Sequence, residues 1–218
     1  MGSSRKKLIK FSEVHEMKNV LETGDKFLKF KLWQKLLSKR KIILELACGR
    51  GEYAVYLAQT NKKASVWGVD IQGERIWHGA KMGQEKKILN LNFLRTNIEK
   101  IDKYFQKNSV DEIWITFPDP FSKEKRQNKR LTGPYFLKIY QKILKKNGTI
   151  HLKTDDEKFF DWSVEQFEKD KNFVLQRVLK DIYSQENLSE LLKNKTRFEE
   201  KHLIDGKKIF YLQIKKHS

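Results

Sequence analysis

The strongest constraint on the fold is a short apolar run that ends in two glycines. Residues 42–47 read Ile-Ile-Leu-Glu-Leu-Ala, Gly49 and Gly51 follow, and a stretch of helical character then extends to about residue 59. A buried strand, a glycine turn and a helix in this order are the first unit of a βαβ fold. The sequence therefore predicts a parallel sheet in which residues 42–47 form a strand.

Apolar strands and amphipathic helices continue to alternate along the rest of the chain. The clearest helix is expected over residues 133–146, where apolar side chains recur every three or four positions and Pro134 lies in the first turn. Further helices are expected over residues 73–88 and 156–170. The other strands are expected at residues 65–70, 92–96, 112–117, 149–153, 173–180 and 208–214. This alternation predicts an α/β protein with a doubly wound, mostly parallel sheet and helices on both faces.

The first 24 residues are expected to be less ordered than the rest of the chain. Residues 1–24 are rich in basic residues and are interpreted as a flexible N-terminal arm. Residues 25–38 place apolar side chains at near-helical spacing, which predicts an amphipathic helix ahead of the first strand. Residues 25–218 are therefore expected to form a single domain.

The positive charge of the chain is concentrated in two segments. Lys and Arg number 46 against 28 Asp and Glu, which gives a formal net charge of +18. Residues 1–40 contain 11 basic and 4 acidic residues, and residues 119–153 contain 10 and 2. Clustered basic charge favours a nucleic-acid partner, although a lysine-rich surface alone does not establish one.

Composition argues against several other classes of protein. No apolar run approaches the roughly 18 residues that a membrane span requires, so we expect no membrane association. The single cysteine, Cys48, cannot form an internal disulfide, and the five histidines show no metal-ligand spacing. We therefore expect a cytoplasmic protein without a metal, in which Cys48 is a small buried residue rather than a nucleophile.

Glycines and polar residues close the predicted strands, where a doubly wound sheet binds its ligands. Gly49 and Gly51 permit a tight turn whose amides can approach a ligand, and Asp70 follows where a carboxylate can accept hydrogen bonds from ribose hydroxyls. The other residues at strand ends are Glu45, Asn97 and Asp119. The pattern predicts a cofactor that carries a nucleoside, but its spacing fits NAD and S-adenosylmethionine equally.

The loop after the fourth predicted strand distinguishes these two cofactors. It reads Phe117-Pro118-Asp119-Pro120-Phe121. Prolines fix φ and remove backbone donors, so the loop is stiff and its carbonyl oxygens stay available as acceptors. A carboxylate beside an aromatic ring suits a planar base that is hydrogen-bonded and stacked. Five basic residues and one acidic residue follow within residues 123–130, and we interpret them as a phosphate-binding segment.

Together these motifs resemble the bacterial tRNA (guanine-N7-)-methyltransferases, a family of class I S-adenosylmethionine-dependent enzymes, from residue 42 to the C-terminus. The resemblance rests on the loop at residues 117–121 with its basic tail through Thr132, on Thr154-Asp155, and on residues 196–199 shortly before Gly206. It implies a Rossmann-like fold with seven strands and an antiparallel last strand. It also implies transfer of a methyl group from S-adenosylmethionine to N7 of guanosine 46 in the variable loop of tRNA. The oligomeric state stays open between a monomer and a homodimer.

The resemblance also implies roles for individual residues. Asp119 is implied to be catalytic and to contact the cofactor. The other implied cofactor-binding residues are Glu45, Gly49, Gly51, Asp70 and Asn97. The implied substrate-binding residues are Lys123, Asp155, Thr196, Arg197, Phe198 and Glu199. Within residues 125–130, the implied RNA-binding residues are Lys125, Arg126, Lys129 and Arg130.

The chain departs from the family pattern at three positions, and two other functions stay open. It has Ala47, Phe121 and Ser122 where the family usually has glycine, tryptophan and proline, and we expect these changes to affect affinity rather than the type of reaction. One alternative is a non-catalytic RNA-binding protein on a methyltransferase fold, against which the retained Asp70 and Asp119 argue. The other is an NAD-dependent oxidoreductase, which does not explain the basic segment after residue 119.

Overall fold

The structure, a computed structural model, describes residues 3–22 and 40–217 and divides the chain into two compact units. One unit ends at Tyr104, and the other begins at Phe105. The helix expected over residues 25–38 lies outside the described residues, and the single domain expected over residues 25–218 stays a prediction.

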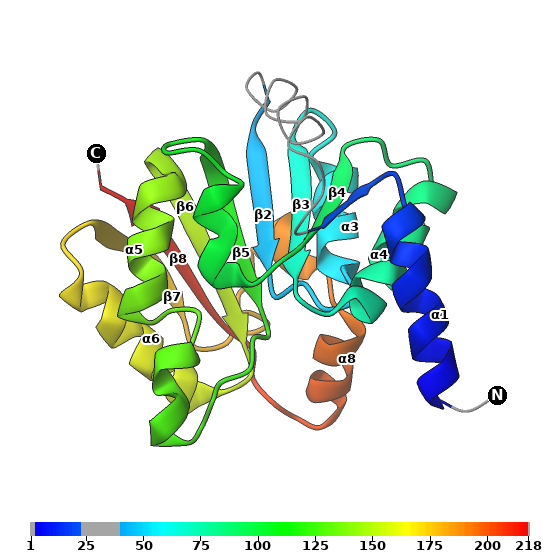
Figure 1. The fold of residues 1–218 in the computed structure, drawn as a ribbon. Helices are drawn as coiled ribbons and strands as arrows, with labels where there is room; N and C mark the ends of the chain where they lie inside the picture. Colours follow the sequence, from blue (N-terminus) through cyan, green and yellow to red (C-terminus); the bar gives the residue numbers. More distant parts are fainter. Residues whose placement is uncertain (1–2, 23–39, 218) are drawn as a thin grey trace. The chain divides into compact units, whose positions relative to one another are not determined.

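Four parallel strands form the sheet of the first unit, with helices packed beside them (Figure 1). Their order is β1-β4-β3-β2, and each neighbouring pair is parallel. The elements are α1 (Ser3–Glu16), β1 (Val20–Glu22), β2 (Ile42–Leu46), α3 (Glu52–Thr60), β3 (Ser65–Asp70), α4 (Gly73–Glu85), β4 (Leu91–Arg95) and the 3₁₀ helix η1 (Ile98–Lys103).

The turn between β2 and α3 confirms the strand, glycine turn and helix predicted from the sequence. Both β2 and β3 are buried along their whole length, as parallel strands covered on both faces usually are. Gly51 precedes α3 with a φ of 70°, a left-handed conformation that glycine adopts at little cost. A Cβ on Gly51 would lie 2.6 Å from the Phe93 ring. Gly51 therefore allows α3 to begin directly against the side chains of the sheet.

The prediction of a flexible arm over residues 1–24 is wrong for residues 3–22. These residues form α1 and β1, and β1 pairs in parallel with β4 in the register Val20 to Phe93. The reason is hydrophobic burial, because Val14, Val20 and Leu21 are each almost completely buried. The many basic residues around these few apolar positions indicate a solvated arm, although the apolar side chains are enough to bury α1 and β1 against the unit.

The second unit combines one parallel strand pair with two antiparallel pairs. Its strand order is β5-β6-β8-β7; β5 and β6 are parallel, whereas β8 is antiparallel to both β6 and β7. The elements are β5 (Val110–Thr116), the 3₁₀ helix η2 (Glu124–Lys129), α5 (Pro134–Ile143), β6 (Leu144–Thr154), α6 (Glu157–Lys169), β7 (Phe173–Leu179), α7 (Glu190–Lys193), α8 (Arg197–Ile204) and β8 (Phe210–Lys216).

The predicted fold class is confirmed, with one difference in the number of strands. The strands are mostly parallel, and the last strand is antiparallel to its neighbours. The described residues contain eight strands rather than the seven expected, because β1 adds a short strand beside β4. Of the helices in residues 3–22 and 40–217, none has the length and apolar character needed to cross a membrane.

Candidate functional site

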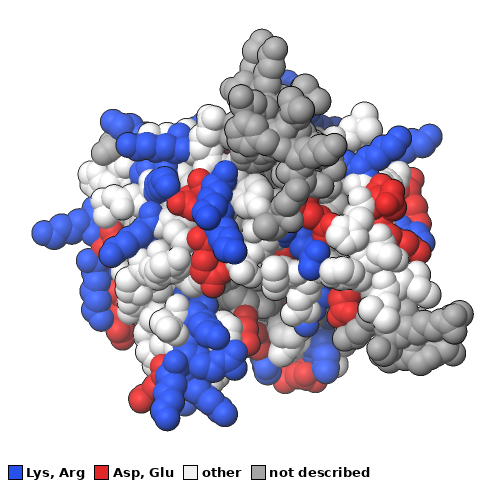
Figure 2. Space-filling model, viewed as in Figure 1, with Lys and Arg blue, Asp and Glu red and all other residues white. Residues whose placement is uncertain are grey.

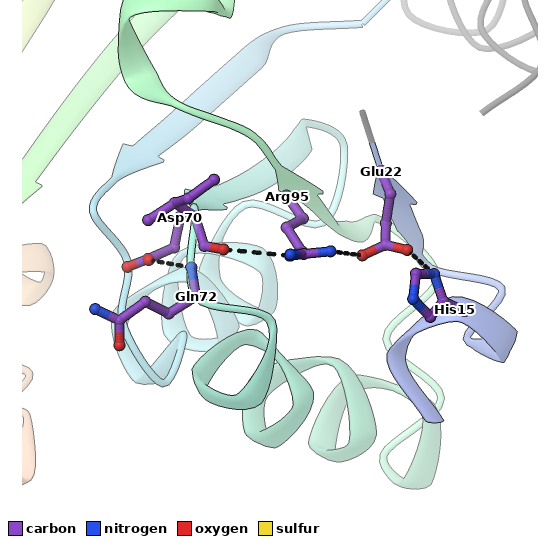
Figure 3. A network of polar contacts seen from close by, with 6 residues as sticks. His15, Glu22, Asp70, Gln72 and Arg95 are labelled. Atoms are coloured by element: carbon purple, nitrogen blue, oxygen red, sulfur yellow. Dashed lines mark hydrogen bonds and ion pairs between the residues drawn. The ribbon is translucent and has the colours of Figure 1, made fainter. Parts of the chain in front are cut away.

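Asp70 connects the two turns that follow β2 and β3. Its Oδ2 accepts a hydrogen bond from the backbone N of Gly49 at 2.9 Å. Its Oδ1 accepts one from the backbone N of Gln72 at 2.8 Å (Figure 3). The side chain is held in place by these bonds, yet each carboxylate oxygen has a second lone-pair site. Asp70 can therefore still accept hydrogen bonds from ribose hydroxyls, as the sequence analysis expects.

Glu45 holds the start of α3 rather than lying open to solvent. Its side chain is only 2% exposed, and its Oε2 accepts a hydrogen bond from the backbone N of Ala54 at 2.8 Å. A carboxylate at a helix N-terminus is favourable, because it satisfies a backbone donor and interacts with the positive end of the helix dipole. Glu45 therefore sets the position of the glycine turn from inside the unit.

Gly49 leaves an open space beside the turn. Its φ is 53°, and a Cβ built on it would meet no atom within 4 Å. A ligand can thus approach the backbone of the turn at a place that a side chain would obstruct. The N–H groups of Gly49 and Gly51 are already bonded inside the unit, to Asp70 Oδ2 and to the Cys48 carbonyl, so the turn offers a nucleoside-bearing cofactor open space and the Asp70 carboxylate rather than these two donors.

Asn97 lines a cavity of about 230 Å³ next to the turn that follows Asp70. Ile71, the residue after Asp70, also lines this cavity. Ile71 in addition lines a second cavity of about 350 Å³, together with Leu8 and Phe11 of α1. The structure thus brings Asn97 and the Asp70 turn together, as the sequence analysis expects, and it adds α1 to this region.

Arg95 links the Asp70 turn to the N-terminal elements, a role that the sequence analysis missed (Figure 3). Its Nε donates a hydrogen bond to the backbone O of Ile71 at 3.2 Å, and its Nη1 donates one to Glu22 Oε1 at 2.8 Å. The other oxygen of Glu22 pairs with His15 of α1. The guanidinium of Arg95 also lies 4.3 Å from the ring centre of Phe11. A signal was present, because Arg95 is the last residue of a strand, where such sheets place functional side chains.

Cys48 lies in this region but is not a nucleophile. Burial raises the pKa of the Cys48 thiol well above its usual value, and the nearby charges of Glu45 and Asp70 raise it further. The thiol therefore stays protonated at neutral pH and lacks the reactivity of a thiolate.

In the second unit, the loop that carries Asp119 has an unusual backbone. Phe117 and Phe121 both have positive φ, of 48° and 42°, which costs free energy in residues with a side chain. Asp119 Oδ1 accepts a hydrogen bond from the backbone N of Phe121 at 2.9 Å. The Asp119 side chain is exposed, so the loop presents a carboxylate in a defined position.

Arg130 does not have the exposed position that an RNA-binding residue needs. It is only 6% exposed, and its Nε donates a hydrogen bond to the backbone O of Pro120 at 2.8 Å. Its guanidinium also lies 4.5 Å from the ring centre of Trp162, and burial lowers its pKa. The role of Arg130 as an exposed RNA-binding residue is therefore corrected. The physical reason is that the Pro120 carbonyl, which the sequence leaves available as an acceptor, accepts a hydrogen bond from Arg130.

The other cations of the basic segment are exposed. Lys and Arg side chains gather at the lower left of Figure 2, where η2 lies in Figure 1. The exposed cations of this segment are Lys123, Lys125, Arg126 and Lys129. Arg126 lies 4.6 Å from the ring centre of Phe121, so the ring expected to stack on a base contacts a guanidinium in this structure.

The residues implied to bind substrate near the C-terminus lie beside the Asp119 loop. The rings of Phe117 and Phe198 are 5.3 Å apart, and Phe198 is 48% exposed. Thr196 accepts a hydrogen bond from the backbone N of Glu199 and so caps α8. Asp155 Oδ2 lies 2.9 Å from Nδ1 of His202, which belongs to α8. Arg197 is exposed at the start of α8, so three of these residues, Thr196, Arg197 and Phe198, lie close to Asp155.

Glu199 is the exception among these residues, because it is completely buried. Its Oε2 accepts a hydrogen bond from Lys153 Nζ at 2.8 Å, and its Oε1 accepts one from the Tyr183 hydroxyl at 2.7 Å. Both oxygens are therefore used inside the unit, and the expectation that Glu199 contacts the substrate does not fit its position. Within the described residues, no group of three or more His, Cys, Asp or Glu side chains is arranged to hold a metal ion.

Comparisons with known proteins identify close relatives. A family model described as "Putative methyltransferase" matches residues 39–212. A tRNA (guanine-N(7)-)-methyltransferase of Christiangramia forsetii is 39% identical over 224 residues, which cover 99% of each chain. The protein of the same name from Bacteroides fragilis is 39% identical over 184 residues, or 84% of this chain and 72% of that protein.

Solved structures agree in fold at lower sequence identity. The 16S rRNA (adenine(1408)-N(1))-methyltransferase of Catenulisporales acidiphilia has a TM-score of 0.60 at 13% identity and covers 87% of this chain and 94% of that one. A SAM-dependent methyltransferase of Aquifex aeolicus has a TM-score of 0.55 at 15% identity and covers 94% and 97%. Likeness at this level of identity shows the fold.

Proposed function

Because this chain belongs to the tRNA (guanine-N(7)-)-methyltransferase family, we propose that it transfers the methyl group of S-adenosylmethionine to N7 of guanosine 46 in the variable loop of tRNA. The observation that carries this proposal is the 39% identity with the Christiangramia forsetii enzyme over 99% of both chains. Similarity over nearly the whole of both chains argues for the same reaction. The same match argues against the NAD-dependent oxidoreductase.

The residues of the first unit fit the proposed cofactor. When bound, S-adenosylmethionine supplies an electrophilic methyl group on a sulfonium. Asp70 would accept hydrogen bonds from the ribose hydroxyls, and the open space at Gly49 would admit the ligand close to the backbone of the turn. Asn97 would bind from the neighbouring cavity. Glu45 and Gly51 would act by holding the turn, because both face the interior of the unit.

The chemistry of the acceptor determines what Asp119 has to do. Guanine N7 has an in-plane lone pair and no proton, so its methylation needs no general base. Positive charge develops on the guanine ring during transfer, and a fixed carboxylate lowers the energy of that charge. We propose that Asp119 orients the base and stabilises this charge, while most of the rate enhancement comes from positioning.

The exposed cations of the second unit would bind the tRNA backbone. Lys123, Lys125, Arg126 and Lys129 lie on or next to η2 and are all exposed, which suits contacts to phosphates. Asp155, Thr196, Arg197 and Phe198 would contact the substrate beside the Asp119 loop. We further propose that the enzyme acts in the cytoplasm on tRNA as a monomer or a homodimer.

The direct test is methylation of an unmodified tRNA transcript with methyl-labelled S-adenosylmethionine, followed by nucleoside analysis and mapping of the label. We expect 7-methylguanosine at position 46. A transcript that has adenosine at position 46 is the matched substrate control and should remain unlabelled. Label at another position would contradict the proposed specificity, and tRNA binding without any label would favour the non-catalytic RNA-binding protein.

A further inference from the structure

A histidine on α4 has a positively charged donor at each of its ring nitrogens. Lys10 Nζ lies 3.0 Å from His78 Nε2, and Arg50 Nη2 lies 3.2 Å from His78 Nδ1. Lysine and arginine only donate hydrogen bonds, whereas a neutral imidazole accepts at one nitrogen and donates at the other. A neutral His78 ring therefore cannot accept a hydrogen bond from Lys10 and from Arg50 at the same time. One of the two cations keeps a hydrogen-bond donor that can turn to another acceptor.

A tryptophan beside this histidine orders two lysines. Lys10 Nζ lies 4.9 Å and Lys81 Nζ 4.6 Å from the ring centre of Trp77. The indole is itself held, because its Nε1 donates a hydrogen bond to Glu13 Oε2 at 2.5 Å. Free lysine side chains lose conformational entropy when they are ordered. Lys10 and Lys81 have already lost part of this entropy before any ligand binds.

Among the described residues, three cations of this surface have no carboxylate partner. We define the α1–α4 cationic cluster as Lys10, Arg50 and Lys81 around His78 and Trp77. In the part of the chain that the structure describes, none of the three cations forms an ion pair with a carboxylate. Three ordered cations with surplus donors are suited to an anion that accepts several hydrogen bonds, and a phosphate group has this property.

The position of Arg50 indicates which kind of phosphate group the cluster binds. Arg50 lies between Gly49 and Gly51, in the turn that we propose holds the methyl donor. The phosphate would thus bind next to the cofactor turn, where a nucleic acid must pass if one of its bases is to be methylated. Building on the proposed function, we propose that the α1–α4 cationic cluster binds the phosphate backbone of tRNA, as a contact surface additional to the η2 segment.

The test compares tRNA binding by the full-length protein and by the double variant Lys10→Gln/Lys81→Gln. The matched control is Lys62→Gln/Lys63→Gln, which removes the same charge from two exposed lysines of the same unit. Each phosphate contact contributes about 0.7 to 0.9 to the slope of log affinity against log salt. We therefore expect the wild-type advantage over the Lys10/Lys81 variant to grow about sevenfold to twelvefold between about 200 mM and 50 mM salt.

Three outcomes decide the proposal. An equal loss of slope in both double variants would overturn it, because net charge rather than the cluster would then be responsible. A weaker affinity for S-adenosylhomocysteine with unchanged tRNA binding would also overturn it and would assign the cluster to the cofactor. A reduced slope in the Lys10/Lys81 variant alone supports the cluster. Failure of the methylation assay in the wild type would contradict the proposed function. The salt slopes of tRNA binding would still decide whether the cluster binds tRNA.

Discussion

Lys153 and Glu199 form an ion pair in which neither side chain is exposed to solvent. Lys153 Nζ lies 2.8 Å from Glu199 Oε2, and the Tyr183 hydroxyl bonds to the other carboxylate oxygen. Burial lowers the pKa of Lys153, and the charge of Glu199 opposes this shift. The pair connects β6 to α8, the helix that begins with the proposed substrate residues Arg197 and Phe198. We infer that Glu199 positions these residues and does not itself contact tRNA.

The first prediction is that Lys153→Met is strongly destabilising but is rescued by a second change. The single variant leaves the Glu199 carboxylate buried without a cation, which typically costs about 3–5 kcal/mol. In Lys153→Met/Glu199→Gln both charges are absent, and the amide oxygen can still accept from Tyr183. We expect the double variant to be clearly less destabilised than the sum of the single variants in urea unfolding.

The same cycle tests the role of Glu199 through tRNA kinetics. If Glu199 only positions α8, the KM for tRNA recovers in the double variant together with stability. If instead Glu199 contacts tRNA, the stable double variant keeps the high KM of Glu199→Gln. That second result would restore the role implied by the family resemblance.

The second prediction separates Arg130 from the exposed cations of η2. Arg130→Gln removes the hydrogen bond to Pro120 and loosens the Asp119 loop, so we expect kcat to fall on the order of tenfold to a hundredfold. The salt dependence of tRNA binding should not change, because the guanidinium is buried. Lys125→Gln/Lys129→Gln should do the opposite and reduce the salt slope by about 0.7 to 0.9 per residue. A reduced slope in Arg130→Gln would show that Arg130 binds phosphate after all.

The third prediction concerns Asp119. Asp119→Ala should lower kcat far more than it weakens cofactor binding, because the carboxylate is proposed to orient the base and stabilise charge that develops only during transfer. Single-turnover methylation and calorimetric titration with S-adenosylhomocysteine measure the two effects separately. An equal loss in both would assign Asp119 to the cofactor alone.

The fourth prediction is that the N-terminal elements support cofactor binding. Arg95→Met removes the hydrogen bonds to Ile71 and Glu22, which should loosen the turn after Asp70 and raise the Kd for S-adenosylhomocysteine about tenfold. Glu22→Gln keeps one acceptor for Arg95 and should have a smaller effect. A lower melting temperature with an unchanged Kd would mean that α1 and β1 stabilise the unit without tuning its ligand site.

The fifth prediction is that Ala47→Gly stabilises the protein. Ala47 has a φ of 54°, and this left-handed conformation costs a residue with a Cβ about 1–2 kcal/mol. Glycine removes that cost but loses about 0.5–1 kcal/mol of chain entropy, so a net gain of up to about 1.5 kcal/mol is expected in urea unfolding. Ala58→Gly, inside α3, is the control and should destabilise by about 1 kcal/mol or more. A loss of stability in Ala47→Gly would show that the methyl group packs favourably enough to outweigh the strain.

The order of the elements and the position of the cofactor turn could be derived from the chain itself. Hydrophobic periodicity and glycine placement are local signals, so β2, the turn at Gly49 and Gly51, and the strand ending in Asp70 all lie where the sequence indicates. The same local signals identified the Asp119 loop and its basic tail. They misjudged residues 3–22, because frequent basic residues obscure the few apolar positions that hold α1 and β1 in place.

Whether a charged side chain faces solvent or the interior depends on partners that are distant in the sequence. Glu199 is buried because Lys153, 46 residues earlier, lies opposite it, and Arg130 turns inward because Pro120 and Trp162 offer it a carbonyl and a ring. A residue pattern can show that a cation or a carboxylate belongs near a site. Only the folded chain decides whether that charge is free to meet a ligand or is used to hold the site together, since burial and pairing arise from long-range contacts.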